Sequence, residues 1–498
     1  MAGFASERPM RETDDEIRHQ RLRPVTSHHE GHDMTGQGQK HPRPMKEPMV
    51  MMAVDHYGPY RWVQAPVAAL ALWLIVSPFT IGYTSRALMW SDMVSGIVVL
   101  AMSVCALKPQ RGLVSWLISL VGLWLLFAPL LFRAPDAASY ANDTIVGALL
   151  IGFAFLIPMG MTMEGPVIPP GWSYNPSAWP QRAPMIALAF VSFLAARYMA
   201  GYQLGHIDAV WDPFFGDGTR RVLESEVSRA WPVSDAGLGA MTYMIEMLMG
   251  LMGDQRRWRT MPWMVAGFGF VVVPLGIVSI VLVIMQPLAV GAWCFLCLFT
   301  AAAMLLMIPL SLDEIVAMVQ FVRRKKREGH SAWRVFWLGG DIPADTPTWE
   351  TTRPEVWQPR GMLWGFTGTW SLWLSAAIGA WLMVAPAAFG IGIDEAAADS
   401  DHLVGALIIV VSIIAMAEVA RPARLLNIPL GSWLIAAPWF LEGAAGLSRW
   451  NSALMGVAVV LLSLPPGRLR DHYGRFDRFI LWPRARADRN GGRTSHAC

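Results

Sequence analysis

The sequence predicts an all-α integral membrane protein with about twelve transmembrane helices. The composition is 54% hydrophobic and only 15% charged, the apolar residues gather in long runs, and basic residues mark every second connection between those runs. A helix needs about 20 apolar residues to cross the hydrocarbon core of a bilayer. The runs expected to do so are 62–83, 88–107, 113–133, 142–162, 184–204, 236–253, 261–286, 290–310, 366–390, 402–420, 430–447 and 452–467.

The basic connections predict the orientation of the chain. Stretches such as KPQR (108–111), RRKKR (323–327) and RPAR (421–424) fall on one side under the count of twelve, whereas connections on the other side are acidic or mixed. Because basic loops stay in the cytoplasm, we expect both termini there. The net charge of +3 suggests no nucleic-acid partner, and membrane lipid is the expected surrounding.

The first 55 residues differ from the rest of the chain. They are polar, of mixed charge and without apolar periodicity, which predicts a disordered cytoplasmic segment. A cleavable signal is not expected, because no basic start followed by an apolar stretch is found there. The histidines of SHHEGHD (27–33) are interpreted as solvated rather than metal-binding.

A repeated pattern of Trp, Pro and Asp or Ser flanks the centre of the chain. The four sets are Trp73, Pro78 and Asp92; Trp124, Pro129 and Asp143; Trp381, Pro386 and Asp401; and Trp433, Pro438 and Ser452. Regular repetition indicates one supersecondary unit used four times. We predict a helical hairpin in each, with Trp at the membrane interface, Pro ending the outgoing helix, and Asp or Ser capping the returning one.

The segments WLIVSPF, WLLFAPL, WLMVAPA and WLIAAPW, which carry this pattern, resemble the SPW repeat, a bacterial membrane hairpin. The resemblance implies two hairpins before residue 180 and two after residue 365. It implies topology and no particular function.

The segment GAWCFLC (291–297) contains the only Cys-x-x-C of the chain. Cysteines three residues apart on a helix share a face and can approach disulfide geometry. Pro287 and Gly291 precede them, so Cys294 is expected near a helix N-terminus, where the dipole favours a thiolate. The alternative is that Cys294 and Cys297 only pack as small apolar residues. A zinc site would need two further ligands, so no metal is expected.

The surroundings of this pair resemble the vitamin K epoxide reductase family. Residues 185–310 combine four predicted helices, a long outer loop and a Cys-x-x-C at the outer end of the fourth helix. The segment VLESEVSRAWPVSDAGLGAMTY is similar to the loop of that family. On this resemblance, Ser225 and Ser228 match its serine and loop positions, Tyr243 its second-helix tyrosine, and Thr300 a small hydroxyl position.

The resemblance implies a membrane quinone, ubiquinone or menaquinone, held among the four helices. Cys297 would form the adduct with the quinone, and Cys294 would be the exchanging partner. Family members usually carry a second cysteine pair in the outer loop that relays electrons to a thioredoxin-like protein. This loop has no cysteine, and the segment 219–221 stands at the relay position.

The predicted function is therefore membrane thiol–disulfide oxidoreduction between the Cys-x-x-C and a quinone, without the loop relay. An external thioredoxin-like thiol protein would have to reach the pair directly. The alternative is a non-catalytic membrane scaffold that keeps the fold. A transporter is disfavoured because the helices divide four, four and four rather than six and six.

One predicted membrane helix carries an acid. Glu246 lies in MTYMIEMLMG, with Tyr243 one turn earlier, and Arg197 falls at a similar depth in the preceding helix. Acids inside a membrane are costly and indicate function by default. We expect Glu246 and Arg197 to be able to pair. Glu246 or Tyr243 could supply protons for quinone reduction, and the alternative is a purely structural ion pair.

These observations divide the chain into six parts, in a protein expected in the bacterial inner (cell) membrane with the Cys-x-x-C near the outer face. The parts are the disordered segment 1–55, two SPW-like hairpins at 56–165, the core similar to vitamin K epoxide reductase at 180–325, a cytoplasmic linker at 326–364, two further hairpins at 365–467, and a basic cytoplasmic tail at 468–498.

Overall fold

The computed structural model describes residues 62–106, 112–156, 165–343, 359–392, 395–444 and 446–480. Within these ranges the chain is helical, with two isolated bridges, Trp172–Tyr473 and Phe366–Ala417, as the only β-type pairing. The predicted class of helical membrane protein is confirmed. The predictions for segment 1–55 and its histidines, and for the tail beyond residue 480 with Cys498, fall outside the described residues.

In the described part of the chain, nine helices are long and apolar enough to cross a membrane. They are α2 (Gln64–Ile81), α3 (Arg86–Ala106), α4 (Gly112–Leu131), α5 (Ala137–Ala154), α6 (Trp179–Gln203), α11 (Pro262–Met285), α12 (Phe295–Arg327), α14 (Trp370–Ala388) and α15 (Ala396–Ile414). The other expected spans correspond to α9 (Asp235–Leu251), α16 (Asn427–Ala436) and α17 (Gly446–Ser463). The count of twelve stays a prediction.

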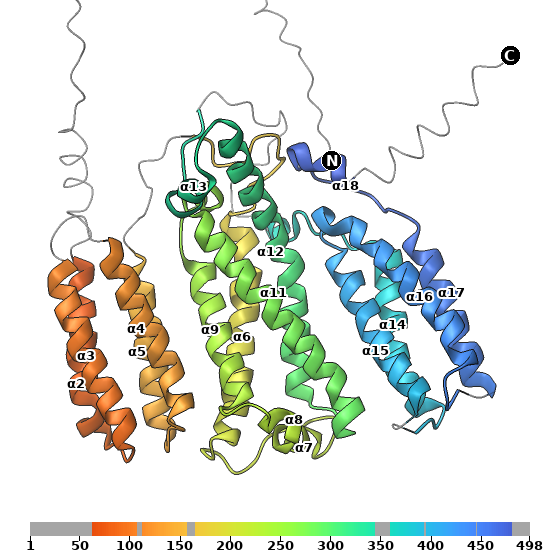
Figure 1. The fold of residues 1–498 in the computed structure, drawn as a ribbon, viewed down its shortest axis with the longest axis horizontal. Helices are drawn as coiled ribbons and strands as arrows, with labels where there is room; N and C mark the ends of the chain where they lie inside the picture. Colours follow the sequence, from red (N-terminus) through yellow and green to blue (C-terminus); the bar gives the residue numbers. More distant parts are fainter. Residues whose placement is uncertain are drawn as a thin grey trace, which may run out of the picture. The chain divides into compact units, whose positions relative to one another are not determined.

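The repeats form two pairs of antiparallel hairpins, α2–α3 with α4–α5, and α14–α15 with α16–α17 (Figure 1). One glycine of each repeat lies where the two helices cross. A Cβ added at Gly96 would lie 2.6 Å from the carbonyl oxygen of Ala71, and one at Gly405 would lie 2.7 Å from that of Gly379. Small residues let membrane helices approach closely, so these glycines set the spacing within each hairpin.

The repeat Asp and Ser residues are not N-caps, and that prediction is wrong. Helix α3 begins at Arg86, six residues before Asp92, and α5 begins at Ala137, six residues before Asp143. The N-cap of α5 is Asp136, whose carboxylate accepts the backbone N–H of Ser139 at 2.7 Å. The prolines also differ from the prediction, because α2 continues three residues past Pro78.

Asp92 and Asp143 lie instead between the two hairpins. Both side chains are fully buried, and the hydroxyl of Tyr83 contacts both carboxyl groups, at 2.8 Å and 3.2 Å. In the second pair of hairpins the hydroxyl of Ser452 donates to Asp401 at 2.8 Å. The repeat polar residue is therefore a contact between hairpins, and a single hairpin viewed alone could not reveal it.

The repeat tryptophans tie the hairpins of each pair together. Each indole N–H donates to the residue directly before the Asp or Ser of the other hairpin. The pairs are Trp73 to Asn142 (2.7 Å), Trp124 to Ser91 (2.9 Å), Trp381 to Asn451 (3.0 Å) and Trp433 to Ser400 (3.0 Å). The bonds are reciprocal, so the repeated pattern encodes the docking of one hairpin on the next.

Between the two pairs of hairpins in sequence, α6, α9, α11 and α12 form the core (Figure 1). Large apolar side chains fill its interior, among them Met185, Phe268, Val272 and Met304. Burial of an apolar side chain stabilises a protein by about 25 cal/mol per Å² of surface removed from water. This gain applies to the core only where water, and not lipid, would otherwise reach these side chains. In a membrane, close packing and polar contacts between helices contribute the rest.

Buried arginines join the core helices at the end away from the cysteine pair. Arg257, in α10 (Arg257–Thr260), forms a two-point contact with Glu314 of α12, with N–O distances of 2.6 Å. Arg257 also donates to the carbonyl oxygens of Met249 and Met252, at the end of α9. The last carbonyls of a helix have no partner within it, so this arginine caps α9 while holding α12.

Candidate functional site

The cysteine pair sits where one helix ends and another begins. The chain leaves α11 through a π-helical turn (Gln286–Val290), reverses at Gly291 with φ of 63°, and starts α12 at Phe295. Positive φ is accessible to glycine at no steric cost, which explains Gly291 at the reversal. Cys294 is the N-cap of α12, which confirms the predicted position near a helix N-terminus, and its sulfur accepts the backbone N–H of Cys297 at 3.1 Å.

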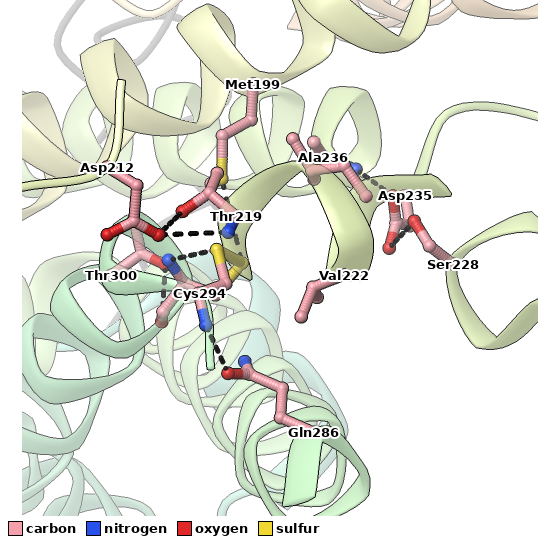
Figure 2. The surroundings of a disulfide bond; sticks show 12 residues. Met199, Asp212, Thr219, Val222, Ser228, Asp235, Ala236, Gln286, Cys294 and Thr300 are labelled. Carbon is pink, nitrogen blue, oxygen red and sulfur yellow. Dashed lines mark hydrogen bonds between the residues drawn. A yellow bond between two sulfur atoms is a disulfide. The ribbon is translucent and has the colours of Figure 1, made fainter. Parts of the chain in front are cut away.

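The two sulfurs lie at disulfide distance, with the Cα atoms 5.3 Å apart, inside the usual range for a bridge (Figure 2). The two cysteines differ in exposure. Cys294 is fully buried, whereas Cys297 is partly exposed. The backbone N–H of Cys294 donates to the side-chain oxygen of Gln286 at 2.9 Å, which fixes the turn (Figure 2). The sulfur of Cys297 lies 3.7 Å from that of Met199.

An apolar cavity of about 290 Å³ opens beside Cys297. Its wall comes from α6, α9, α11, α12 and the segment between α6 and α9, and consists mostly of aliphatic side chains. A few polar groups interrupt this wall, among them Tyr243, Gln286 and Thr300. Cys297 lines the cavity and Cys294 does not. A mostly apolar pocket with a few placed polar groups is the usual form of a small-molecule site.

The hydroxyl positions singled out in the sequence gather around this cavity. The Tyr243 hydroxyl donates to the carbonyl oxygen of Thr300 at 3.2 Å, and the Thr300 hydroxyl donates to that of Cys297 at 3.1 Å. Ser225 and Ser228 also line the cavity. Ser225 is the N-cap of the short helix α8 (Glu226–Arg229), and Ser228 donates to Asp235 at 2.9 Å. Asp235 is a cavity residue that the sequence analysis did not predict.

The long segment between α6 and α9 covers Cys294. Its helix α7 (Gly218–Glu224) packs against the start of α12, and the backbone of Gly218 lies so close to the carbonyl of Trp293 that a side chain at 218 would overlap it. Thr219, at the expected relay position, is fully buried. Its backbone N–H and hydroxyl donate to Asp212 at 2.9 Å and 2.7 Å (Figure 2).

Asp212 is the residue that closes this segment on itself. It also accepts the backbone N–H groups of Phe214 and Phe215, at 3.1 Å and 2.8 Å. Partial burial raises the pKa of Asp212, but the hydrogen bonds from Thr219, Phe215 and Phe214 outweigh it, so the pKa lies below its ordinary value. The ionised carboxylate therefore stabilises the closed segment at neutral pH.

The expected pair between Glu246 and Arg197 is not formed, and that prediction is wrong. The Arg197 guanidinium lies over the ring of Tyr140, on α5, 3.2 Å from the ring centre. Such a cation–π contact is favourable in a desolvated site. Glu246 is 1% exposed, and neither carboxylate oxygen has a hydrogen-bond partner among the described residues. Glu246 and Arg197 lie at a similar depth in the membrane, but their side chains do not face each other.

Three residues around the pair were not predicted from the sequence. Gln286 carried a usable signal, because it is a polar residue at the end of a strongly apolar helix, directly before Pro287. Asp212 lies in a segment rich in acids, so nothing distinguished it. Met199 is an apolar residue in an apolar helix, and only its contact with Cys297 marks it.

Comparison with known families matches two kinds of domain. Residues 183–312 match the vitamin K epoxide reductase family, and residues 61–157 and 369–465 match the SPW repeat domain. No curated protein and no solved structure matches the chain. Both resemblances predicted from the sequence are confirmed.

Proposed function

This chain carries a core domain of the vitamin K epoxide reductase family between two SPW repeat domains, and on that premise we propose that it is a membrane thiol–quinone oxidoreductase. The observation that carries the proposal is the position of Cys297 in the wall of an apolar cavity that α6, α9, α11 and α12 surround. The head group of ubiquinone or menaquinone is the ligand that this family and this wall suggest.

Each cysteine has its own role in the proposal. Cys297 faces the cavity and is the thiol that reacts with the quinone. Cys294, fully buried behind it, then attacks the Cys297 sulfur, which closes the disulfide and releases the quinone as quinol. In this direction the two thiols lose two electrons and two protons, the S–S bond forms, and one quinone becomes a quinol. The position of Cys294 at a helix N-terminus favours its thiolate during exchange.

The proton route involves Tyr243 and Glu246. Tyr243 lines the cavity, and Glu246 lies one turn further along the same face of α9, where its carboxylate has no hydrogen-bond partner within the described part of the chain. A buried acid without a counter-ion is costly, and its retention suggests a proton store for the reaction. Glu246 does not line the cavity itself, so Tyr243 would pass its proton on.

The source of reducing electrons follows from the burial of Cys294. An external thioredoxin-like thiol protein would reach Cys294 only after the segment closed by Asp212 has moved aside. The segment offers no cysteine of its own to act as a relay. The competing proposal is a membrane scaffold that keeps this fold without turnover, since a buried pair behind a closed segment is also what a purely structural disulfide needs.

The test is quinol formation by the full-length protein in lipid nanodiscs, with dithiothreitol as the reductant and a short-chain ubiquinone or menaquinone as the acceptor. Wild type is expected to turn over, and Cys294→Ser and Cys297→Ser to be inactive. Cys105→Ser is the matched control, because Cys105 is exposed and free, and it should keep full activity. Equal quinol formation by wild type and Cys297→Ser would exclude the oxidoreductase in favour of the scaffold.

A further inference from the structure

A second cavity lies at the opposite end of α12 from the cysteine pair. It has a volume of about 880 Å³, is open to solvent, and is lined by α12, the segment 169–170, Trp258 of α10, Ile342 and the segment 475–476. The two cavities share helix α12, but no residue lines both of them. Five of the side chains in the lining are basic, namely Arg323, Arg324, Lys326, Arg327 and Arg475.

The charges around this cavity are not balanced. Glu328 is the single carboxylate in the lining, and its two oxygens already bind Arg324 at 2.9 Å and Lys325 at 2.8 Å. Among the described residues, Arg323, Lys326 and Arg475 form no ion pair with a carboxylate. Like charges three or four residues apart on a helix repel each other, so this end of α12 gains stability from a bound anion.

The floor of the cavity is apolar and tightly packed. Trp258 and Phe321 are 1% and 2% exposed, and their rings meet edge to face with centres 5.7 Å apart. The Trp258 indole N–H donates to the carbonyl oxygen of Val167 at 2.8 Å, and Gln320 donates to that of Tyr473 at 2.9 Å. The positive-inside rule explains basic residues at one end of a membrane helix, but it does not explain an aromatic floor beside them.

The depth of the basic residues narrows the choice of ligand. Helix α12 has 33 residues, which is about 50 Å at a rise of 1.5 Å per residue. Counted from Phe295 at one membrane boundary, Arg323 lies about 42 Å along the helix, roughly 12 Å beyond a hydrocarbon core of about 30 Å. Lipid head groups reach roughly 5–8 Å past the core on each side, so the backbone at Arg323 lies just beyond them, and its long side chain can reach back to the phosphates or out into the water.

We propose that this cavity binds a phosphate-bearing anion, with the basic side chains on the phosphate and the apolar part of the ligand on the aromatic floor. Arginine is suited to phosphate because its planar donors form paired, charge-assisted hydrogen bonds. The phosphate belongs either to a free phosphorylated compound or to the head group of an anionic lipid. The site is independent of the proposed redox activity and does not involve Cys294 or Cys297.

The experiment uses full-length protein and two probes. Inorganic pyrophosphate is titrated in neutral detergent at constant ionic strength, and cardiolipin is added to phosphatidylcholine nanodiscs, with thermal unfolding and native mass spectrometry as readouts. The triple variant Arg323→Ala, Lys326→Ala, Arg475→Ala removes three lining cations that form no ion pair with a carboxylate among the described residues. The matched control is Arg478→Ala, an exposed arginine nearby that does not line the cavity.

The proposal is supported if either probe stabilises wild type and the control variant. The triple variant should bind the same probe with an affinity lower by about tenfold or more. A response to pyrophosphate alone assigns a free phosphorylated compound, and a response to cardiolipin alone assigns a lipid head group. If the triple variant does not fold, the single charge reversal Arg475→Glu replaces it. Equal responses of wild type and variant, or no response to either probe, would overturn the proposal.

Discussion

Replacing Arg257 with Ala should destabilise the core more than any exposed charge change nearby. The Arg257 side chain is 1% exposed and contacts both oxygens of Glu314, which is 2% exposed. Truncation leaves the Glu314 carboxylate buried with only the Ser177 hydroxyl and the more distant charge of Arg182 to compensate. It also removes the donor to the carbonyls at the end of α9.

The magnitude follows from the kind of pair. Breaking a buried ion pair by removing one partner costs about 3–5 kcal/mol, because the remaining charge is stranded in a medium of low polarity. The neighbouring pair Arg256–Asp254 has a distance of 3.3 Å, and its side chains are 36% and 43% exposed. Surface pairs of that kind contribute about 0–1 kcal/mol. Arg256→Ala is therefore the matched control.

The assay is thermal unfolding of the purified protein in detergent, followed by tryptophan fluorescence. Arg257→Ala should lower the midpoint by roughly 3–10 °C and Arg256→Ala by no more than about 2 °C. Combining Arg257→Met with Glu314→Gln should recover much of the loss, since no charge is then stranded. If Arg257→Ala unfolds at the same temperature as Arg256→Ala, the buried pair does not hold the core together.

Three further predictions concern other sites. The pKa of Asp212 is lowered in the folded protein, so its ionised carboxylate stabilises the closed segment fully above about pH 4, its ordinary pKa. This stabilisation is lost as the pH falls further. Hydrogen exchange of residues 212–219 should therefore rise at acidic pH in wild type and at all pH values in Asp212→Ala. Asp143→Asn removes one of the two carboxyl groups that face Tyr83 but keeps a hydrogen-bond acceptor, so this variant should unfold at no lower temperature than wild type. Asp143→Ala should lose about 1–3 kcal/mol of unfolding free energy, measured by thermal unfolding. The reverse order of the two variants would refute this role of Asp143. Thr219→Cys should place a relay thiol next to Cys294. Combined with Cys297→Ser, it should form a disulfide between positions 219 and 294 that peptide mass spectrometry detects under non-reducing conditions. Free thiols at both positions would show that residues 219 and 294 are not close together.

The helical hairpins and the place of the cysteine pair could be predicted from the sequence because their signals are local. Apolar runs predict spans, and a Pro and a Gly before Cys294 predict a new helix start, which the structure confirms. The role of Asp92 and Asp143 could not be predicted in this way. Asp is a common N-cap, but these residues meet between two hairpins that are separate in sequence.

Contacts between helices account for the other differences. The rotation of each helix about its own axis decided that Arg197 faces Tyr140 rather than Glu246. The pairing of Arg257 with Glu314 joins residues 57 positions apart. The acidic residue in the apolar helix α12 was visible as SLDEIV, and an acid there implies a partner, but the sequence could not identify which arginine reaches it.

The central claim is that Cys294 and Cys297 exchange electrons with a quinone, and their redox state in native membranes tests it most directly. Labelling with a mass-tagging maleimide, with and without prior reduction, would be compared in wild type and Cys294→Ala, in membranes with quinone present or depleted. We expect a disulfide in wild type that becomes reduced when quinone is depleted. Thiols that stay reduced whether or not quinone is present would contradict it and favour the scaffold.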